Sequence, residues 1–131
     1  MGKISVLIIE AHTVFLRSLT ELLANQPDIE VVGETQSAAD APNSMRTFAP
    51  DVVVVDISLT GNSGLAVGRE LKVISPTTKI VILTEDDQIV YRRAVRDAGA
   101  DALVKKAFIA ADLIPCIRKV SQEEFVDGIE Q

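Results

Sequence analysis

The stretch Asp51-Val-Val-Val-Val-Asp56 decides the fold class of this chain. A near-continuous apolar run of this kind is typical of a strand that is buried on both faces of a parallel sheet. The run ends in a carboxylate, Asp56, and ligands of open α/β sheets bind at the carboxyl ends of the strands. The stretch therefore predicts both the kind of sheet and the edge at which a functional site lies.

Apolar runs alternate with segments of helical period along the rest of the chain. Strands are predicted at residues 3–9, 29–34, 51–56, 79–84 and 102–104. Helices are predicted at residues 13–25, 37–48, 64–75 and 88–98, and in a last helix that starts near Asp112, so that Pro115 falls in its first turn. Residues 58–63 are predicted to be a loop. Strict alternation with short connections predicts an α/β fold, with a five-stranded, doubly wound parallel sheet and helices on both faces.

Composition limits the kinds of partner that this chain binds. The 131 residues are typical of one domain, and the 121–131 segment is acidic and weakly apolar, as in a C-terminal tail or linker stub. Lys and Arg total 13 against 19 for Asp and Glu, and the net charge of −6 disfavours direct nucleic-acid binding. No apolar run approaches the ~20 residues of a membrane span. A single cysteine, Cys116, suits a reducing compartment, so we expect a cytoplasmic protein without membrane contacts.

Reactive side chains stand at the ends of four predicted strands: Glu10, Asp56, Thr84 and Lys106. Because parallel strands end at the same edge of a sheet, we expect these side chains to meet in one pocket. Carboxylates bind a hard cation such as Mg²⁺, while an ammonium and a hydroxyl contact phosphoryl oxygens. An aspartate in such surroundings can act as a nucleophile toward phosphorus.

Four pieces of sequence resemble the receiver domain of two-component response regulators in their order and spacing. They are Ile8-Ile9-Glu10-Ala11-His12, Val55-Asp56-Ile57-Ser58-Leu59-Thr60-Gly61-Asn62-Ser63-Gly64, Leu83-Thr84 and Ala98-Gly99-Ala100-Asp101-Ala102-Leu103-Val104-Lys105-Lys106. The chain looks closest to the subfamily whose receivers precede a helix-turn-helix output domain. The resemblance implies a receiver domain at residues 1–120 and a flavodoxin-like sheet of strand order 2-1-3-4-5.

The resemblance also implies a role for each site residue. Asp56 would accept a phosphoryl group from a histidine kinase or phosphotransfer protein. Glu10 would hold Mg²⁺ mainly through water, with Asp56 and the backbone carbonyl of Ser58 as further ligands. Thr84 would bind a phosphoryl oxygen, and Lys106 would pair with the phosphate. Phosphorylation would switch protein–protein contacts, including those of a possible homodimer, and the domain would not be an enzyme in its own right.

Ala11 stands where the family places the acid that binds Mg²⁺ directly. Mg²⁺ often keeps several waters and needs only one or two protein carboxylates. Since Glu10 and Asp56 remain, we expect a weakened Mg²⁺ site and not an absent one.

Four further positions bear on the site. Leu103 replaces an aromatic residue whose rotamer reports activation in many receivers, and Glu85 adds a negative charge directly after the predicted strand. Ala107 follows the lysine where proline is common, so we expect a trans peptide bond there, because a cis bond before a residue other than proline costs roughly 3 kcal/mol. His12 is the only histidine, and we expect it to cap or front the first helix.

Two functions remain open for a chain with these features, and a third is disfavoured. One is a receiver that is phosphorylated on Asp56. The second is a degenerate receiver that acts as an interaction or dimerisation module independently of phosphorylation, which Ala11, Leu103 and Glu85 favour. A small enzyme or flavin carrier is disfavoured because no glycine-rich phosphate loop follows the first predicted strand.

Overall fold

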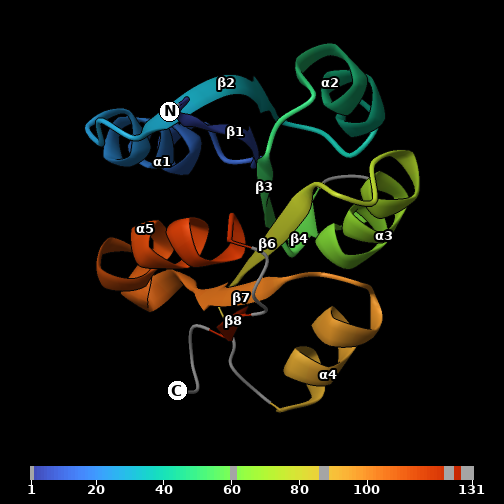
Figure 1. Ribbon diagram of the computed structural model, residues 1–131. Helices are drawn as coiled ribbons and strands as arrows, with labels where there is room; N and C mark the ends of the chain where they lie inside the picture. The colour runs from blue at the N-terminus through green and yellow to red at the C-terminus, as the bar shows by residue number, and fades with distance from the viewer. Residues whose placement is uncertain (1, 60–61, 86–88, 123–125, 128–131) are drawn as a thin grey trace.

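A six-stranded parallel sheet runs through the centre of the protein (Figure 1). The structure is a computed structural model that describes residues 2–59, 62–85, 89–122 and 126–127. The sheet order is β2-β1-β3-β6-β7-β8. These strands are β1 (Ile4–Ile9), β2 (Ile29–Thr35), β3 (Val52–Asp56), β6 (Lys79–Thr84), β7 (Ala102–Lys105) and β8 (Val126–Asp127). The first five strands confirm the predicted parallel sheet and its order.

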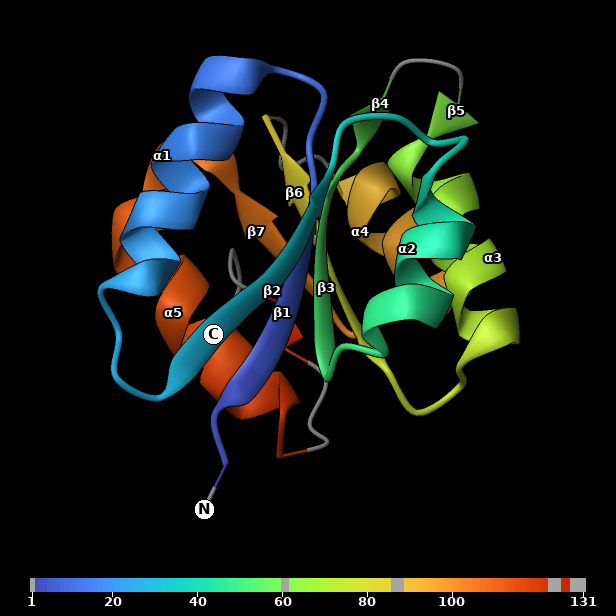
Figure 2. The same cartoon turned by 90° about the horizontal axis from the view of Figure 1, so that it is seen from above.

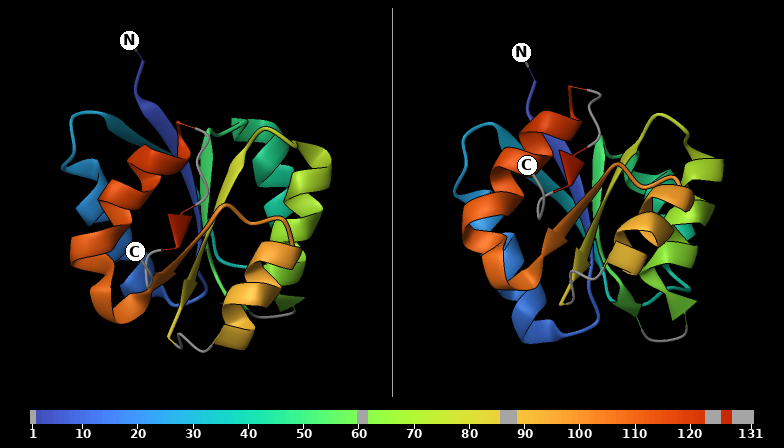
Figure 3. Two further views of the ribbon diagram at one scale, coloured as in Figure 1. Left: turned by 60° about the horizontal axis from the view of Figure 1, so that its bottom comes forward. Right: turned by 90° about the horizontal axis from the view of Figure 1, so that it is seen from below.

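Helices cover both faces of the sheet (Figures 2 and 3). On one face lie α1 (Thr13–Ala24) and α5 (Ile109–Val120), and on the other lie α2 (Ala41–Phe48), α3 (Gly64–Ile74) and α4 (Ile89–Asp97). Alternate residues of β3 serve the two layers, because successive side chains of a strand point to opposite faces. Val52 and Val54 pack with α1 and α5, while Val53 and Val55 pack with the α2 and α3 layer. This arrangement confirms the doubly wound α/β fold.

Two short elements lie outside the sequence prediction. The segment predicted as a loop at 58–63 contains an antiparallel pair, β4 (Ser58–Leu59) and β5 (Asn62–Ser63), and residues 60–61 are outside the described part of the chain. β8 pairs in parallel with β7, so part of the segment predicted as a tail joins the sheet edge. Strands of two residues are too short to show any periodicity, which is why the sequence does not predict them.

The start of α5 corrects a prediction. The last helix was expected to begin near Asp112, yet it begins at Ile109 after a 3₁₀ turn at Lys106–Phe108, and Pro115 lies inside it. An interior proline costs roughly 3 kcal/mol because it removes a hydrogen bond and crowds the preceding turn. Five side chains of α5 are buried: Leu113, Ile114, Cys116, Ile117 and Val120. Burial of one large aliphatic side chain stabilises by about 1.5–3 kcal/mol, so packing of this face outweighs the proline.

Replacement of Pro115 by alanine is therefore expected to stabilise the fold. Pro115 is exposed, so Pro115→Ala loses little packing and restores a backbone donor to the carbonyl of Ala111. We expect the free energy of unfolding in urea to rise by about 1–3 kcal/mol. Pro42→Ala is the matched control, because Pro42 lies in the first turn of α2 and interrupts no helical hydrogen bond. A gain from Pro42→Ala equal to that from Pro115→Ala would contradict this account of α5.

Candidate functional site

The carboxyl edge of the sheet brings together the four side chains predicted from the strand ends. Asp56 and Thr84 are the last residues of β3 and β6, Glu10 follows β1, and Lys106 follows β7. The Lys106 ammonium donates to Asp56 Oδ2 at 3.0 Å, and its Nζ lies 3.6 Å from Glu10 Oε1. A cavity of about 360 Å³ opens at this edge, and it is lined by His12, Asp56, Ile57, Ser58, Thr84, Glu85 and Lys106.

Strand alternation separates the two adjacent lysines. Lys106 reaches the acids of the pocket, and its Nζ also lies 4.5 Å from the centroid of the Phe15 ring on α1. The Lys105 ammonium instead lies 5.4 Å from the ring centroid of Phe108, outside the set of residues that line the cavity. The cation–π contact and the ion pair together hold the Lys106 ammonium over Asp56.

The Glu10 side chain is fully buried, and only one of its two carboxylate oxygens accepts a hydrogen bond within the described residues. Its Oε2 accepts a hydrogen bond from the backbone N–H of His12 at 3.1 Å, while Oε1 has no hydrogen-bond partner among the described residues. Burial raises the pKa of Glu10, and the nearby Asp56 carboxylate acts in the same direction. The partial charge that is left uncompensated on Oε1 suits a cation, because a buried carboxylate oxygen without a donor is costly.

Asp56 is held in place by the turn that follows β3. Its Oδ1 accepts from the backbone N–H of Ser58 at 3.2 Å. The Ile57 N–H donates to Leu83 on β6 at 2.9 Å, and Gly64 at the start of α3 donates to the Ile57 carbonyl at 2.8 Å. These backbone bonds fix the direction of the Asp56 side chain, which is itself only 2% exposed.

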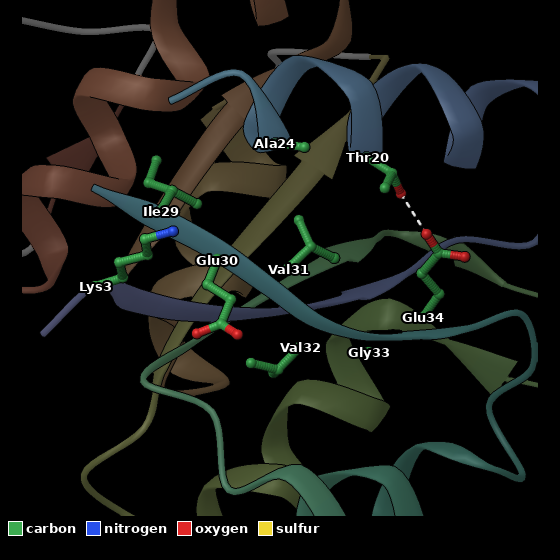
Figure 4. Close-up of a pocket in the computed structure, with 9 residues that line it drawn as sticks. All are labelled: Lys3, Thr20, Ala24, Ile29, Glu30, Val31, Val32, Gly33 and Glu34. Carbon is green, nitrogen blue, oxygen red and sulfur yellow. Dashed lines mark hydrogen bonds between the residues drawn. The ribbon is translucent and has the colours of Figure 1, made fainter. Parts of the chain in front are cut away.

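A second hollow lies along the outer strand β2 and contains none of the predicted site residues (Figure 4). Its volume is about 570 Å³, larger than that of the strand-end cavity. Thr20 on α1 donates to Glu34 across it at 2.6 Å. Its two acids and one lysine are Glu30, Glu34 and Lys3, and among the described residues no ion pair joins the lysine to either acid. The strand-end cavity, with its buried acids and lysine, is therefore the candidate functional site.

The response regulator receiver domain model matches residues 6–118. The chain belongs to this family. The chain is 33% identical over 125 residues to the response regulator protein VraR of Staphylococcus epidermidis, with 94% of this chain and 59% of the relative covered. Thus the receiver spans about 59% of the length of the curated relatives it matches.

Solved structures show the same fold. The crystal structure of a LuxR-family two-component response regulator from Aurantimonas superposes with a TM-score of 0.91 at 23% identity, covering 95% of this receiver and 89% of that chain. The isolated receiver domain of RcsB from Salmonella enterica serovar Typhimurium, in the presence of phosphomimetic BeF₃⁻, gives 0.87 at 21% identity, covering 96% and 94%. None of the helices in the described ranges is long and apolar enough to span a lipid bilayer.

The structure places each of the four further positions that bear on the site. Leu103 is buried in the layer that β7 shares with α2, α3 and α4, and Glu85 is exposed at the cavity. Ala107 lies in the 3₁₀ turn, and the peptide bonds of the described residues are all trans, which confirms the expectation for this bond. His12 occupies the N-cap position of α1, as expected for a residue that fronts the helix.

One feature of His12 is absent from the sequence prediction. Its side chain makes no capping hydrogen bond, and Nδ1 lies 3.2 Å from Glu10 Oε2. His12, Glu10 and Asp56 each offer one ligand atom, and these three atoms lie within 4.8 Å of one another. The signal in the sequence is the Glu-x-His spacing directly after a buried strand, which places a carboxylate and an imidazole together at the functional edge.

Gly64 is expected to be irreplaceable at the foot of the Asp56 turn. A Cβ at this position would collide with the backbone carbonyl of Asp56 and lie 2.8 Å from the Cα of Ile57. We expect Gly64→Ala to lower the free energy of unfolding in urea by about 1–3 kcal/mol, because backbone atoms cannot move aside as side chains do. Gly68→Ala, in the same helix, is the control, since its Cβ meets the side chain of Ile80 at 3.3 Å. Equal losses for the two variants would contradict the tight approach of α3 to this turn.

Because the pKa of Glu10 is raised, replacing its carboxyl group is predicted to stabilise the fold to an extent that depends on pH. The folded receiver holds the Glu10 proton more tightly than the unfolded chain, so this group lowers stability as the pH rises from 4.5 through the raised pKa. We expect Glu10→Gln to raise the free energy of unfolding at neutral pH, and the gain to shrink as the pH falls toward 4.5. Urea unfolding of both proteins in EDTA at several pH values measures this difference in the free energy of unfolding.

Glu21→Gln is the matched control for that series, because Glu21 is an exposed carboxylate on α1. Its effect on the free energy of unfolding is expected to be small. If Glu10→Gln instead lowers stability by a constant amount over the whole pH range, the burial of an under-satisfied carboxylate is not the dominant property of Glu10.

Proposed function

We propose that Asp56 of this receiver accepts a phosphoryl group from the phosphohistidine of a histidine kinase or phosphotransfer protein. The observation that supports this most strongly is the Asp56 carboxylate, held at 3.0 Å from the Lys106 ammonium at the wall of a cavity of about 360 Å³. A cavity of this kind has room for a phosphoryl group beside its acceptor. Thr84 lines the same cavity and offers a hydroxyl to that group.

The transfer requires one new bond and the loss of another. A carboxylate oxygen of Asp56 attacks phosphorus in line with the donor, the P–O bond forms, and the P–N bond of the phosphohistidine breaks with its electron pair returning to the imidazole nitrogen. Lys106 offsets the negative charge on the equatorial oxygens. The Ser58 N–H, which already donates to Asp56 Oδ1 at 3.2 Å, keeps the carboxylate oriented during the attack.

A divalent cation fits the donor set beside Asp56. The orphaned Oε1 of Glu10 and the Asp56 carboxylate supply oxygen ligands, and the Ser58 carbonyl lies in the same turn. When bound, Mg²⁺ would neutralise charge on the phosphoryl oxygens. The absence of an acid at position 11 weakens this site, so that saturation requires a higher Mg²⁺ concentration than a site with three acids.

The output of the switch is proposed to be a change in protein–protein contacts. The matched relatives are longer than this chain, and the resemblance to receivers that precede a helix-turn-helix domain supports a role in transcription regulation. Nucleic acid would then be bound by such an output domain and not by this receiver, whose net charge is −6. We infer a cytoplasmic protein that forms a homodimer on phosphorylation and performs no catalysis beyond the chemistry of its own Asp56.

A degenerate, phosphorylation-independent interaction module is the second candidate. Ala11 removes a ligand, Glu85 places an exposed negative charge at the cavity, and Leu103 has no ring to reorient. Each of these features weakens phosphorylation or its readout, and none of them weakens a constitutive protein contact.

Small phosphodonors distinguish the two candidates. We expect acetyl phosphate or phosphoramidate with millimolar Mg²⁺ to add one phosphoryl group to the receiver, measured as intact mass, because Asp56 lies beside Lys106 and the cavity. Asp56→Asn, which keeps the size of the side chain but removes its nucleophile, is expected to show no added mass.

The absence of added mass would contradict phosphorylation of Asp56. An unmodified receiver at saturating donor and high Mg²⁺, with a far-ultraviolet circular dichroism spectrum of a folded α/β protein, would favour the degenerate module. Sedimentation velocity before and after treatment then tests the homodimer, which the first candidate predicts only for the phosphorylated form.

A further inference from the structure

The cluster at the cavity contains a nitrogen donor beside its two acids. Glu10 and Asp56 are buried, whereas the side chain of His12 is 75% exposed at the mouth. One ligand atom from each of the three lies within 4.8 Å of the other two. The imidazole is not occupied in capping α1, because no side-chain capping bond is formed at His12. Its described contact is instead with Glu10.

A second observation points to a ligand at this cluster. Glu10 Oε1 is buried without a hydrogen-bond partner in the described part of the receiver, and the nearest cation to it is the Lys106 ammonium at 3.6 Å. That distance exceeds the range of a hydrogen bond. The two carboxylates share one ammonium, so the cluster retains a net negative charge and an unmet acceptor. A divalent cation held between Glu10 and Asp56 would balance this negative charge and coordinate the unpaired oxygen of Glu10.

The donor set selects among divalent cations. Mg²⁺ is a hard cation that takes oxygen ligands and gives up its waters reluctantly. An imidazole favours later first-row metals, whose affinity for mixed nitrogen and oxygen sites rises from Mn²⁺ toward Cu²⁺ and remains high at Zn²⁺. The Ala11 side chain offers no oxygen ligand to the cluster. The next side chain along the loop, that of His12, offers a nitrogen ligand.

We propose that His12 joins Glu10 and Asp56 as a metal ligand, so that this receiver takes a late first-row divalent cation such as Zn²⁺ in preference to Mg²⁺. The role of that cation in phosphorylation rests on the proposed function, but the binding of the cation does not. The same three residues form the site in the absence of any phosphodonor.

The single histidine makes the test direct. In an untagged receiver, the imidazole proton and nitrogen resonances belong to His12 without further assignment. We expect one equivalent of Zn²⁺ to shift these resonances and an equal concentration of Mg²⁺ to leave them unchanged. Imidazole resonances that do not respond to Zn²⁺ would overturn the proposal.

Calorimetric titrations of variants with Zn²⁺ and Mg²⁺ separate a ligand from a bystander. Loss of a residue that only orients a metal ligand typically weakens affinity by about 10–100-fold, so His12→Ala is expected to weaken Zn²⁺ binding at least tenfold. Its affinity for Mg²⁺ should change by less than about twofold, because Mg²⁺ relies on oxygen ligands. An unchanged Zn²⁺ affinity in folded His12→Ala would overturn the assignment.

Two further variants test the cluster as a unit. Ala11→Asp adds an oxygen ligand, and we expect it to tighten Mg²⁺ binding more than Zn²⁺ binding. The preference of the site for Zn²⁺ over Mg²⁺ should therefore become smaller. Asp56→Asn removes a carboxylate ligand and is expected to weaken the response of the His12 resonances to Zn²⁺. If that response persists undiminished in Asp56→Asn, the exposed imidazole binds metal alone and the three-residue site is wrong. No phosphodonor is present in these titrations, so they succeed or fail independently of phosphorylation at Asp56.

Discussion

The ion pair between Lys106 and Asp56 is the interaction on which the rest of the site depends. The two residues are separated by 50 positions in the chain and join the ends of β7 and β3, across the end of the intervening β6. Asp56 is only 2% exposed. Loss of one partner of a buried pair costs about 3–5 kcal/mol, because the remaining charge stays buried without compensation. The parallel register of the three strands is therefore coupled to the charge balance of the pocket.

The charge balance of the pocket also bears on the cation that it can hold. Two buried acids face one lysine, and the second acid, Glu10, retains an oxygen without a hydrogen-bond partner in the described structure. With alanine at position 11 the loop gains no further oxygen ligand, and His12 places an imidazole against Glu10 instead. The proposed site therefore combines one imidazole nitrogen with two carboxylates.

Most of the fold and the meeting of the strand-end residues follow from patterns that the sequence states plainly. A run such as Val52–Val55 has no polar face, so it requires a sheet covered on both sides, and parallel strands then align Asp56 with Glu10, Thr84 and Lys106. The predicted start of α5 was wrong because the sequence shows the local cost of Pro115 but does not show the tertiary burial that offsets this cost. The contact of His12 with Glu10 is made within a short loop, where no hydrophobic periodicity predicts the direction of a side chain.

A double-mutant cycle on Asp56 and Lys106 tests the central pairing most directly. The free energies of unfolding of Asp56→Asn, Lys106→Met and the double variant are measured in urea at neutral pH with EDTA present. A buried ion pair predicts that the double variant is less destabilised than the sum of the single variants, by about 1–3 kcal/mol. Additive effects within about 0.5 kcal/mol would show that the two side chains do not interact, and the site described at this edge of the sheet would not exist in solution.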